Sequence, residues 1–268
     1  MADGFKRVGG DFAAYGDRYE SIAMERRGDV LEVRFHTDGG PLQWGPGQVH
    51  DEFEDAFQEI ARDSSLRVLI MTGTGEVFSG PIGDAATFPS FPGPRQWEQM
   101  RRGATRLLQG LLEIEATIVS CLNGPAMRHA EIPLLGDIVL AAPDACFRDS
   151  GHLPNRAVPG DGMHFVMPLL LGFNRARQFL LTGRTIDAEE ALRIGVVSEV
   201  LPREQLLPRA REIAADLLEQ NPLALRYAKL LLMEPVRRRA REELGHGLAL
   251  EGLGVIDETL ARTDEAAG

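Results

Sequence analysis

The chain has 268 residues, 44% of them hydrophobic, and a formal net charge of −11 at pH 7. This length and hydrophobic content allow one main domain with a sizeable buried core. The acidic surplus argues against a surface that binds nucleic acid or an anionic membrane, so we expect neither partner.

The N-terminal part of the chain predicts an arm, a hairpin, a helix and a strand. Residues 1–20 are polar and rich in glycine, and are expected to form the arm. Residues 22–25 and 30–35 have strand-like apolar content on either side of a turn-rich break, which is typical of a hairpin. Residues 49–61 place their apolar side chains on one face, so they predict an amphipathic helix. The wholly apolar residues 68–71 predict a strand buried on both faces.

The middle of the chain alternates loops, strands and helices. Residues 84–96 are rich in proline, phenylalanine and small residues, and are expected to form a surface loop or lid. Residues 96–112 carry apolar side chains at helical spacing and predict a helix. The stretch 118–167 holds strand-like apolar runs broken by loops with histidine and aspartate residues. Residues 165–171 and 175–181 are predicted to be helical.

The last third of the chain is predominantly helical in pattern. Asp187 is expected to cap the N-terminus of a helix, because a glutamate three residues later completes a capping box. Residues 195–202 predict a short strand that ends at a proline. From residue 203 to the end the pattern is helical, with breaks expected near Pro222 and Pro235 and no strand.

Strand alternating with helix predicts an α/β core over residues 21–202, followed by a C-terminal helical region over residues 203–268. Cys121 and Cys146 lie in apolar strand-like runs, so we expect buried thiols and no disulfide framework. The N-terminus has no apolar stretch flanked by basic residues, and no run approaches the roughly 18 apolar residues of a membrane span. We therefore expect a cytoplasmic protein.

Three motifs carry a family resemblance: NGPA at residues 123–126, GDIVLAA at 136–142 and VPG at 158–160. In order and spacing they resemble the crotonase superfamily, the enoyl-CoA hydratase/isomerase fold. The resemblance implies a ββα spiral core with a C-terminal helical region that forms a trimer, so the expected assembly is a homotrimer or a dimer of trimers.

The chain departs from that family where the chemistry is carried out. Ile132 and His152 stand where the two catalytic glutamates of a hydratase are expected. Arg128, His129 and Ala130 replace glycines that lead to the usual backbone oxyanion hole. In the segment GPIG at residues 80–83, the proline removes a further backbone donor, although the amide that follows it can still serve.

Within the superfamily the chain is most similar to β-diketone hydrolases of the 6-oxocamphor hydrolase type, which cleave a carbon–carbon bond of a cyclic 1,3-diketone. Such a cleavage requires no metal or organic cofactor in principle, so we expect neither. The catalytic candidates that it implies are His152, Asp161, His129 and Glu251, and the substrate-binding candidates are Trp44, His50 and Ile82.

Retro-Claisen cleavage requires a base that activates water, a donor for the oxyanion and an acid for the leaving enolate. His152 can act as the base if Asp161 holds one ring nitrogen and leaves the other free, a contact that the resemblance implies. His129 can donate a hydrogen bond to a carbonyl oxygen. Glu131 is given no role, because in ungapped register the family's catalytic glutamate falls on Ile132.

Each of these assignments has a structural alternative. Asp161 could cap the helix that begins near Gly162, and His129 could be a core histidine bonded to backbone. Glu251 lies on an apolar helix stripe, where it is either buried or at the exposed edge. Trp44 either walls a pocket and donates its indole N–H or simply packs in the core.

Three functions remain open from the sequence. The leading hypothesis is a cofactor-independent β-diketone hydrolase that converts a 1,3-diketone, expected to be cyclic, into a keto acid. The alternatives are an acyl-CoA hydratase or isomerase, which Ile132 and His152 disfavour, and a catalytically silent oligomeric protein. No short-spaced ligand pair indicates a metal site, and no glycine-rich motif indicates a bound nucleotide.

Overall fold

The computed structural model describes residues 10–45, 48–81 and 93–267, and its core is a six-stranded sheet in the order β1-β2-β4-β6-β7-β10. The strands are β1 (Ile22–Arg27), β2 (Val30–Phe35), β4 (Val68–Thr72), β6 (Thr117–Leu122), β7 (Ile138–Ala141) and β10 (Glu199–Val200). Only β1 and β2 pair antiparallel, and the other neighbours are parallel. The hairpin and the buried central strand that the sequence predicts are confirmed.

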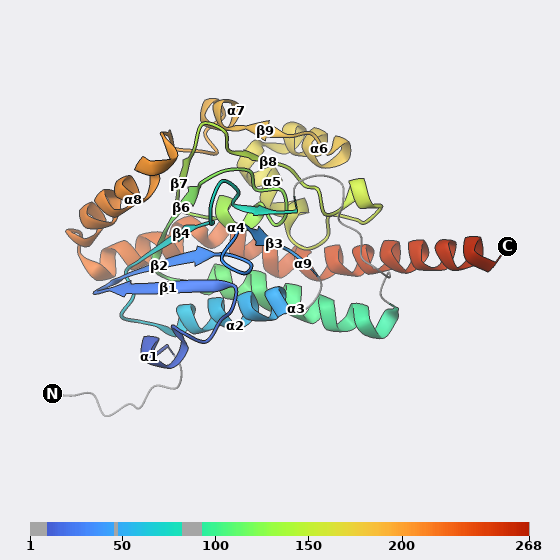
Figure 1. Ribbon diagram of the computed structural model, residues 1–268, viewed down its shortest axis with the longest axis horizontal. Coiled ribbons are helices and arrows are strands. Elements are labelled where there is room, and N and C mark those ends of the chain that lie inside the picture. Colours follow the sequence, from blue (N-terminus) through green and yellow to red (C-terminus); the bar gives the residue numbers. More distant parts are fainter. Residues whose placement is uncertain (1–9, 46–47, 82–92, 268) are drawn as a thin grey trace.

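Helices cover this sheet and extend beyond it (Figure 1). Helix α2 packs against α3, and α9 packs against both α3 and α5, while α8 lies on the central strands. Strands β4 and β6 are buried along their whole length. The bounds are α1 (Phe12–Tyr15), α2 (Gln48–Arg62), α3 (Pro94–Glu113), α5 (Met163–Leu171), α6 (Phe173–Thr182), α7 (Ala188–Arg193), α8 (Arg203–Leu218) and α9 (Pro222–Ala267). The predicted α/β class with a helical C-terminal region is confirmed.

Short elements beside the main sheet carry the loops of the candidate site. Strand β3 (Leu42–Gln43) pairs parallel with β5 (Ser79–Gly80), and β8 (Cys146–Phe147) pairs antiparallel with β9 (Ile186–Asp187). Helix α4 (Glu131–Leu134) and a 3₁₀ turn (Leu153–Asn155) follow β6 and β8. The loop after β6 packs so closely that a Cβ on Gly124 would lie 1.8 Å from the carbonyl oxygen of Glu76.

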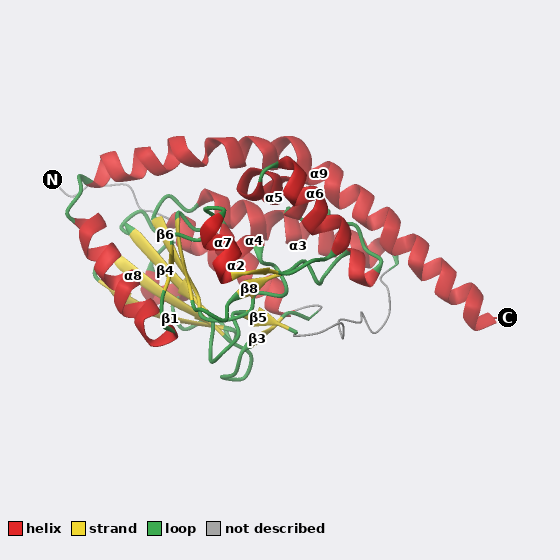
Figure 2. Cartoon of the chain, turned by 90° about the horizontal axis from the view of Figure 1, so that it is seen from above, coloured by secondary structure: helices red, strands yellow, loops and turns green. Residues whose placement is uncertain are grey.

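Helix α9 runs along one side of the core, and its C-terminal part extends past it (Figure 2). The break expected near Pro222 is present, because α8 ends before it and α9 begins there. The break expected at Pro235 is wrong, since α9 continues through that residue. Pro235 lies on an exposed face, where water can satisfy the carbonyl that loses its N–H partner.

The structure tests the expected helix cap at Asp187 and the expected burial of the two cysteines. Asp187 caps α7 by accepting a hydrogen bond from the backbone N–H of Glu190 at 2.8 Å, as predicted. Cys121 is buried, but Cys146 is only half-buried, because it lies in a two-stranded sheet at the margin of the core. Neither cysteine is in a disulfide. Among the described helices, none is both long and apolar enough to cross a lipid bilayer.

Candidate active site

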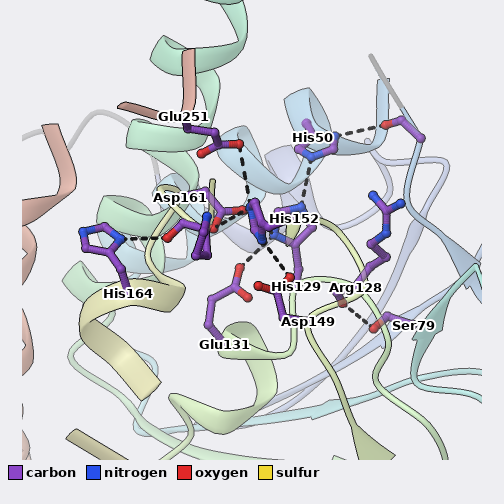
Figure 3. Close-up of polar contacts among 12 residues, drawn as sticks. His50, Ser79, Arg128, His129, Glu131, Asp149, His152, Asp161, His164 and Glu251 are labelled. Atoms are coloured by element: carbon purple, nitrogen blue, oxygen red, sulfur yellow. Dashed lines mark hydrogen bonds and ion pairs between the residues drawn. The ribbon is translucent and has the colours of Figure 1, made fainter. Parts of the chain in front are cut away.

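Five segments between residues 50 and 251 meet in one cluster of histidine and acidic side chains (Figure 3). They are the start of α2, the residues around α4, the loop after β8, the turn before α5 and the middle of α9. The cluster consists of His50, His129, Glu131, Asp149, His152, Asp161 and Glu251. All but Glu131 and Asp149 were expected from the sequence.

His152 is buried between two aspartates. Its Nδ1 lies 2.7 Å from Oδ1 of Asp149, and its Nε2 lies 3.3 Å from Oδ1 of Asp161 and 3.7 Å from Oε1 of Glu251. The structure therefore brings His152 and Asp161 together, as the resemblance implied. One expectation is corrected: the ring nitrogen that does not face Asp161 was expected to be free, but it is bonded to Asp149.

Asp161 does not cap a helix. Helix α5 begins after Gly162, and its N-terminus has no side-chain capping bond. The Asp161 carboxylate instead lies between two imidazoles. Its Oδ2 is 3.7 Å from Nδ1 of His129, and its Oδ1 faces His152. The capping alternative is therefore wrong.

His129 belongs to a chain of hydrogen bonds that runs through two imidazoles. Its Nδ1 lies 2.7 Å from Oε1 of Glu131, and its Nε2 lies 3.2 Å from Nε2 of His50. Nδ1 of His50 lies 3.1 Å from the carbonyl oxygen of Gly45 and must donate to it, so Nε2 of a neutral His50 accepts from His129. When Glu131 is ionised, His129 donates from both nitrogens, which is the imidazolium form. The alternative of a histidine bonded to backbone is wrong.

Trp44 forms an apolar wall beside these two imidazoles. Its ring centroid is 4.3 Å from that of His129 and 4.9 Å from that of His50, and it also packs on Phe53 in the core. It is thus both a core residue and a lining residue of the cluster. No hydrogen bond of its indole N–H is found among the described residues, so its role as a donor stays a prediction.

The remaining sequence candidate for substrate binding is Ile82. Ile82 lies outside the described residues, as does most of the predicted loop or lid at residues 84–96.

Glu251 reaches the cluster because α9 approaches the turn before α5 without intervening side chains. A Cβ on Gly160 would lie 2.2 Å from the carbonyl oxygen of Gly247 and 2.8 Å from Cβ of Glu251. Glycine at position 160 is therefore required for this contact. Glu251 is buried, so the alternative of an acid at the exposed edge of the stripe is wrong.

Two acidic residues of the cluster were missed or set aside in the sequence. Glu131 is buried and bonded to His129, whereas Ile132, the position favoured by register, points into the core. Asp149 is buried and bonded to His152. The spacings His-x-Glu at residues 129–131 and Asp-x-x-His at residues 149–152 were the available signals.

Burial and charge separate the pKa values of the three histidines. Burial, with the neighbouring His129, lowers the pKa of His50 to about 3, so His50 is neutral. Burial alone would also lower the pKa of His129, but the Glu131 carboxylate outweighs it and the pKa is raised. For His152 the carboxylates of Asp161 and Asp149 together outweigh burial and raise the pKa well above 6.5.

The acids of the cluster are shifted in opposite directions. Burial raises the pKa of Glu251 to about 8, and burial also raises the pKa of Glu131. Burial would do the same to Asp161, but the His152 imidazolium outweighs it and lowers the pKa of that carboxyl. At neutral pH the cluster thus holds a protonated acid, Glu251, close to an ionised one, Asp161, which is a pattern typical of acid–base sites.

Among the described residues, two overlapping groups of three meet the spacing that a metal ion requires. They are His129 with Glu131 and Asp161, and His152 with Asp161 and Glu251, and in each the ligand atoms lie within 4.8 Å of one another. The donor set fits a metal poorly, because neighbouring carboxylates already bind both imidazoles and raise their pKa values, whereas a metal ion needs a deprotonated imidazole. The absence of a metal stays a prediction.

Comparisons with known proteins agree with this architecture. The enoyl-CoA hydratase/isomerase family model matches residues 47–250. A solved β-diketone hydrolase from Anabaena sp. PCC 7120, bound to (S)-3-oxocyclohexyl acetic acid, is 41% identical with a TM-score of 0.86, over 91% of this chain and 97% of that chain. Carnitinyl-CoA dehydratase from Citrobacter koseri is 30% identical over 78% of this chain and 79% of that protein. An enoyl-CoA hydratase/isomerase from Mycobacterium paratuberculosis, 22% identical, shares the fold with a TM-score of 0.79.

Proposed function

The chain belongs to the enoyl-CoA hydratase/isomerase family and is an enzyme of the crotonase superfamily, and from that premise we propose that it is a β-diketone hydrolase. The proposed reaction is cofactor-independent retro-Claisen cleavage of a cyclic 1,3-diketone to a keto acid. The observation that carries the proposal is the buried cluster in which His152 and His129 are each bonded to a carboxylate.

A structural neighbour supports the same class of chemistry. The Anabaena β-diketone hydrolase was solved with a keto acid bound, and a keto acid is the product class that retro-Claisen cleavage of a cyclic diketone yields. The two chains are 41% identical, and the match covers 91% of this chain. This neighbour therefore favours a diketone over a thioester substrate.

The cluster contains a group for each step of the reaction. Neutral His152, oriented through Nδ1 by Asp149, takes a proton from water as the water oxygen attacks one carbonyl carbon. Substrate binding redirects the Nε2–H of His129 from Nε2 of His50 to the oxyanion, which it then stabilises. The bond to the central carbon then breaks, its electron pair forms the enolate of the second ketone, and protonated Glu251 supplies a proton to it. One water is consumed, the new carboxylic acid ionises, and the proton held by His152 passes to Glu251, whose Oε1 lies 3.7 Å from Nε2, so that both groups regain their starting forms.

The identity to carnitinyl-CoA dehydratase favours a second candidate, an acyl-CoA hydratase or dehydratase. Such a reaction needs an acid–base residue beside the acyl group. Ile132, at the position where the family places one glutamate, is an apolar side chain packed in the core. A silent protein is disfavoured as well, because buried groups with strongly shifted pKa values are costly to maintain without a function.

The proposal is tested by incubating the purified enzyme with cyclic 1,3-diketones and, in parallel, with enoyl-CoA and carnitinyl-CoA thioesters. We expect keto acids from diketones, with one ¹⁸O atom in the carboxylate when the reaction runs in H₂¹⁸O. Mass spectrometry measures both. Turnover of a thioester with no cleavage across a broad diketone panel would overturn the proposal.

The rate is expected to depend on pH in a bell-shaped manner. The base form of His152 appears only as pH rises through its pKa, which lies well above 6.5, so kcat/KM rises with pH on the acid side. The acid form of Glu251 is lost above about 8, so the rate falls again there. A profile of kcat/KM from pH 5 to 10 measures both limbs. An acid limb below 6.5 would contradict the raised pKa of His152.

Removing divalent metal ions is expected to leave turnover unchanged. His129 and His152 have raised pKa values, which makes them poor metal ligands, and each is already bonded to a carboxylate. Turnover is compared before and after extended dialysis against EDTA, with metal content measured by mass spectrometry. Loss of activity that a divalent ion restores would contradict this expectation and assign a metal to one of the two groups of three.

We further propose that the chain assembles as a homotrimer or a dimer of trimers. Supporting this, α9 exposes large apolar side chains at Leu231, Leu232 and Leu253, which are 77%, 76% and 65% exposed in a single chain. Sedimentation at micromolar concentration is expected to give a trimer or hexamer. A monomer at that concentration would contradict the proposal.

A further inference from the structure

Arg128 immediately precedes His129, and its charge is not used by the acid–base groups described above. Its Nε and Nη2 are buried and have no hydrogen-bond partner among the described residues. Figure 3 shows the guanidinium beside the cluster, with no polar contact drawn to it. Arg209 and Arg211, by contrast, each donate from Nε and Nη2 to a glutamate.

The guanidinium lies close to the acids of the cluster without bonding to them. Nη1 of Arg128 and Oδ1 of Asp149 both lie 3.7 Å from the position that a Cβ of Gly151 would occupy. Asp149 uses that oxygen to bind His152 instead. Burial lowers the pKa of Arg128, while Asp149 and Asp161 counteract that effect, so the group remains a cation.

This placement matters because of the charge that the reaction produces. Cleavage of a neutral diketone by water creates a carboxylate in a site that already contains four acidic side chains, and the two imidazoliums there are bonded to Glu131 and Asp149. A new anion needs another cation to stabilise it. The parallel N–H groups of an arginine Nε/Nη2 edge match a carboxylate in a bidentate manner.

We propose that Arg128 binds a carboxylate of the ligand through its Nε and Nη2. This inference rests on the proposed function, which supplies the keto acid. The carboxylate has two possible sources: the group newly formed by cleavage, or one that the diketone already carries. Arg128 thus determines the charge of the ligand that the site retains, a role distinct from the acid–base steps.

Binding of a keto acid and of its neutral counterpart tests the proposal without turnover. Calorimetry measures Kd for (S)-3-oxocyclohexyl acetic acid and for its primary amide. Wild type is expected to prefer the acid. Arg128→Gln is expected to weaken binding of the acid by roughly 10- to 100-fold, the usual value of a charge-assisted pair, and to leave the amide within about twofold. Arg128→Lys keeps the positive charge but loses the paired N–H donors, so its Kd for the acid is expected to lie between those of wild type and Arg128→Gln.

Arg209→Gln is the matched control, because it removes a cation that pairs with Glu199 on the surface. It is expected to change neither Kd. Circular dichroism and melting temperature report whether each variant folds. If Arg128→Gln does not fold, Arg128→Lys still tests the proposal. The proposal is overturned if wild type shows no preference for the acid, or if the folded variants retain the full preference.

Kinetics with two diketones that differ only in a pendant carboxylate distinguish the two sources. A carboxylate carried by the substrate predicts that Arg128→Gln raises KM for the charged diketone alone. A newly formed carboxylate predicts unchanged KM values and weaker product inhibition by the keto acid. If wild type cleaves no diketone, the proposed function fails, while the comparison of acid with amide still decides the role of Arg128.

Discussion

Replacing His152 with alanine is expected to lower kcat for diketone cleavage by about 10²–10⁴-fold, with a smaller effect on KM, because a positioned general base contributes mainly to the transition state. The structure gives this expectation a geometric basis. Oδ1 of Asp149 lies 2.7 Å from Nδ1 of His152 and keeps the proton on that nitrogen, so the neutral ring presents Nε2 to water.

The alanine variant also leaves Asp149 and Asp161 buried without the cation that they share. Its fold must therefore be verified by circular dichroism and its melting temperature. His152→Gln provides a second variant that fills the same space and still donates a hydrogen bond. Near-wild-type kcat in a folded variant of either kind would rule out His152 as the base.

Asp149→Asn is expected to lower kcat by roughly 10²–10⁴-fold, since an amide can hold the wrong imidazole tautomer and cannot stabilise imidazolium. It should also move the acid limb of the pH profile downward, because a carboxylate that raises the pKa of His152 is removed. A role limited to packing would leave that limb in place, so kcat/KM is measured across pH.

Asp161→Asn is compared in the same assay. Asp161 faces the Nε2 of His152, the nitrogen that must receive the proton, so its loss is expected to act in the same direction. Asp144→Asn, an exposed aspartate that pairs with Arg203, is the matched control and should leave kcat unchanged. Full activity of Asp149→Asn together with loss in Asp161→Asn would assign the orienting role to Asp161 alone.

The sequence predicted most of the secondary structure because local patterns determine it. The hairpin of β1 and β2, the apolar strand β4 and the cap at Asp187 each depend on residues close in the chain. The continuity of α9 through Pro235 could not be predicted, since it depends on which face of the helix meets water.

The site was only partly predictable for a related reason. Resemblance identified His152 and Asp161, but residue types alone could not decide whether Asp161 capped α5 or faced an imidazole. Asp149 was missed because a lone aspartate in a loop gives no periodic signal. Glu131 was set aside because register pointed to Ile132, whereas the turn into α4 directs the glutamate to His129 and packs the isoleucine in the core.

The contact between Gly160 and Gly247 has a consequence for how the chain matures during synthesis. Every other member of the cluster leaves the ribosome before Glu251, which is the most C-terminal of them. Until α9 docks on the turn at Gly160, the carboxylates and imidazoles lack the side of the site that excludes water. The burial that raises the pKa of Glu251 therefore depends on the docking of α9 at Gly160.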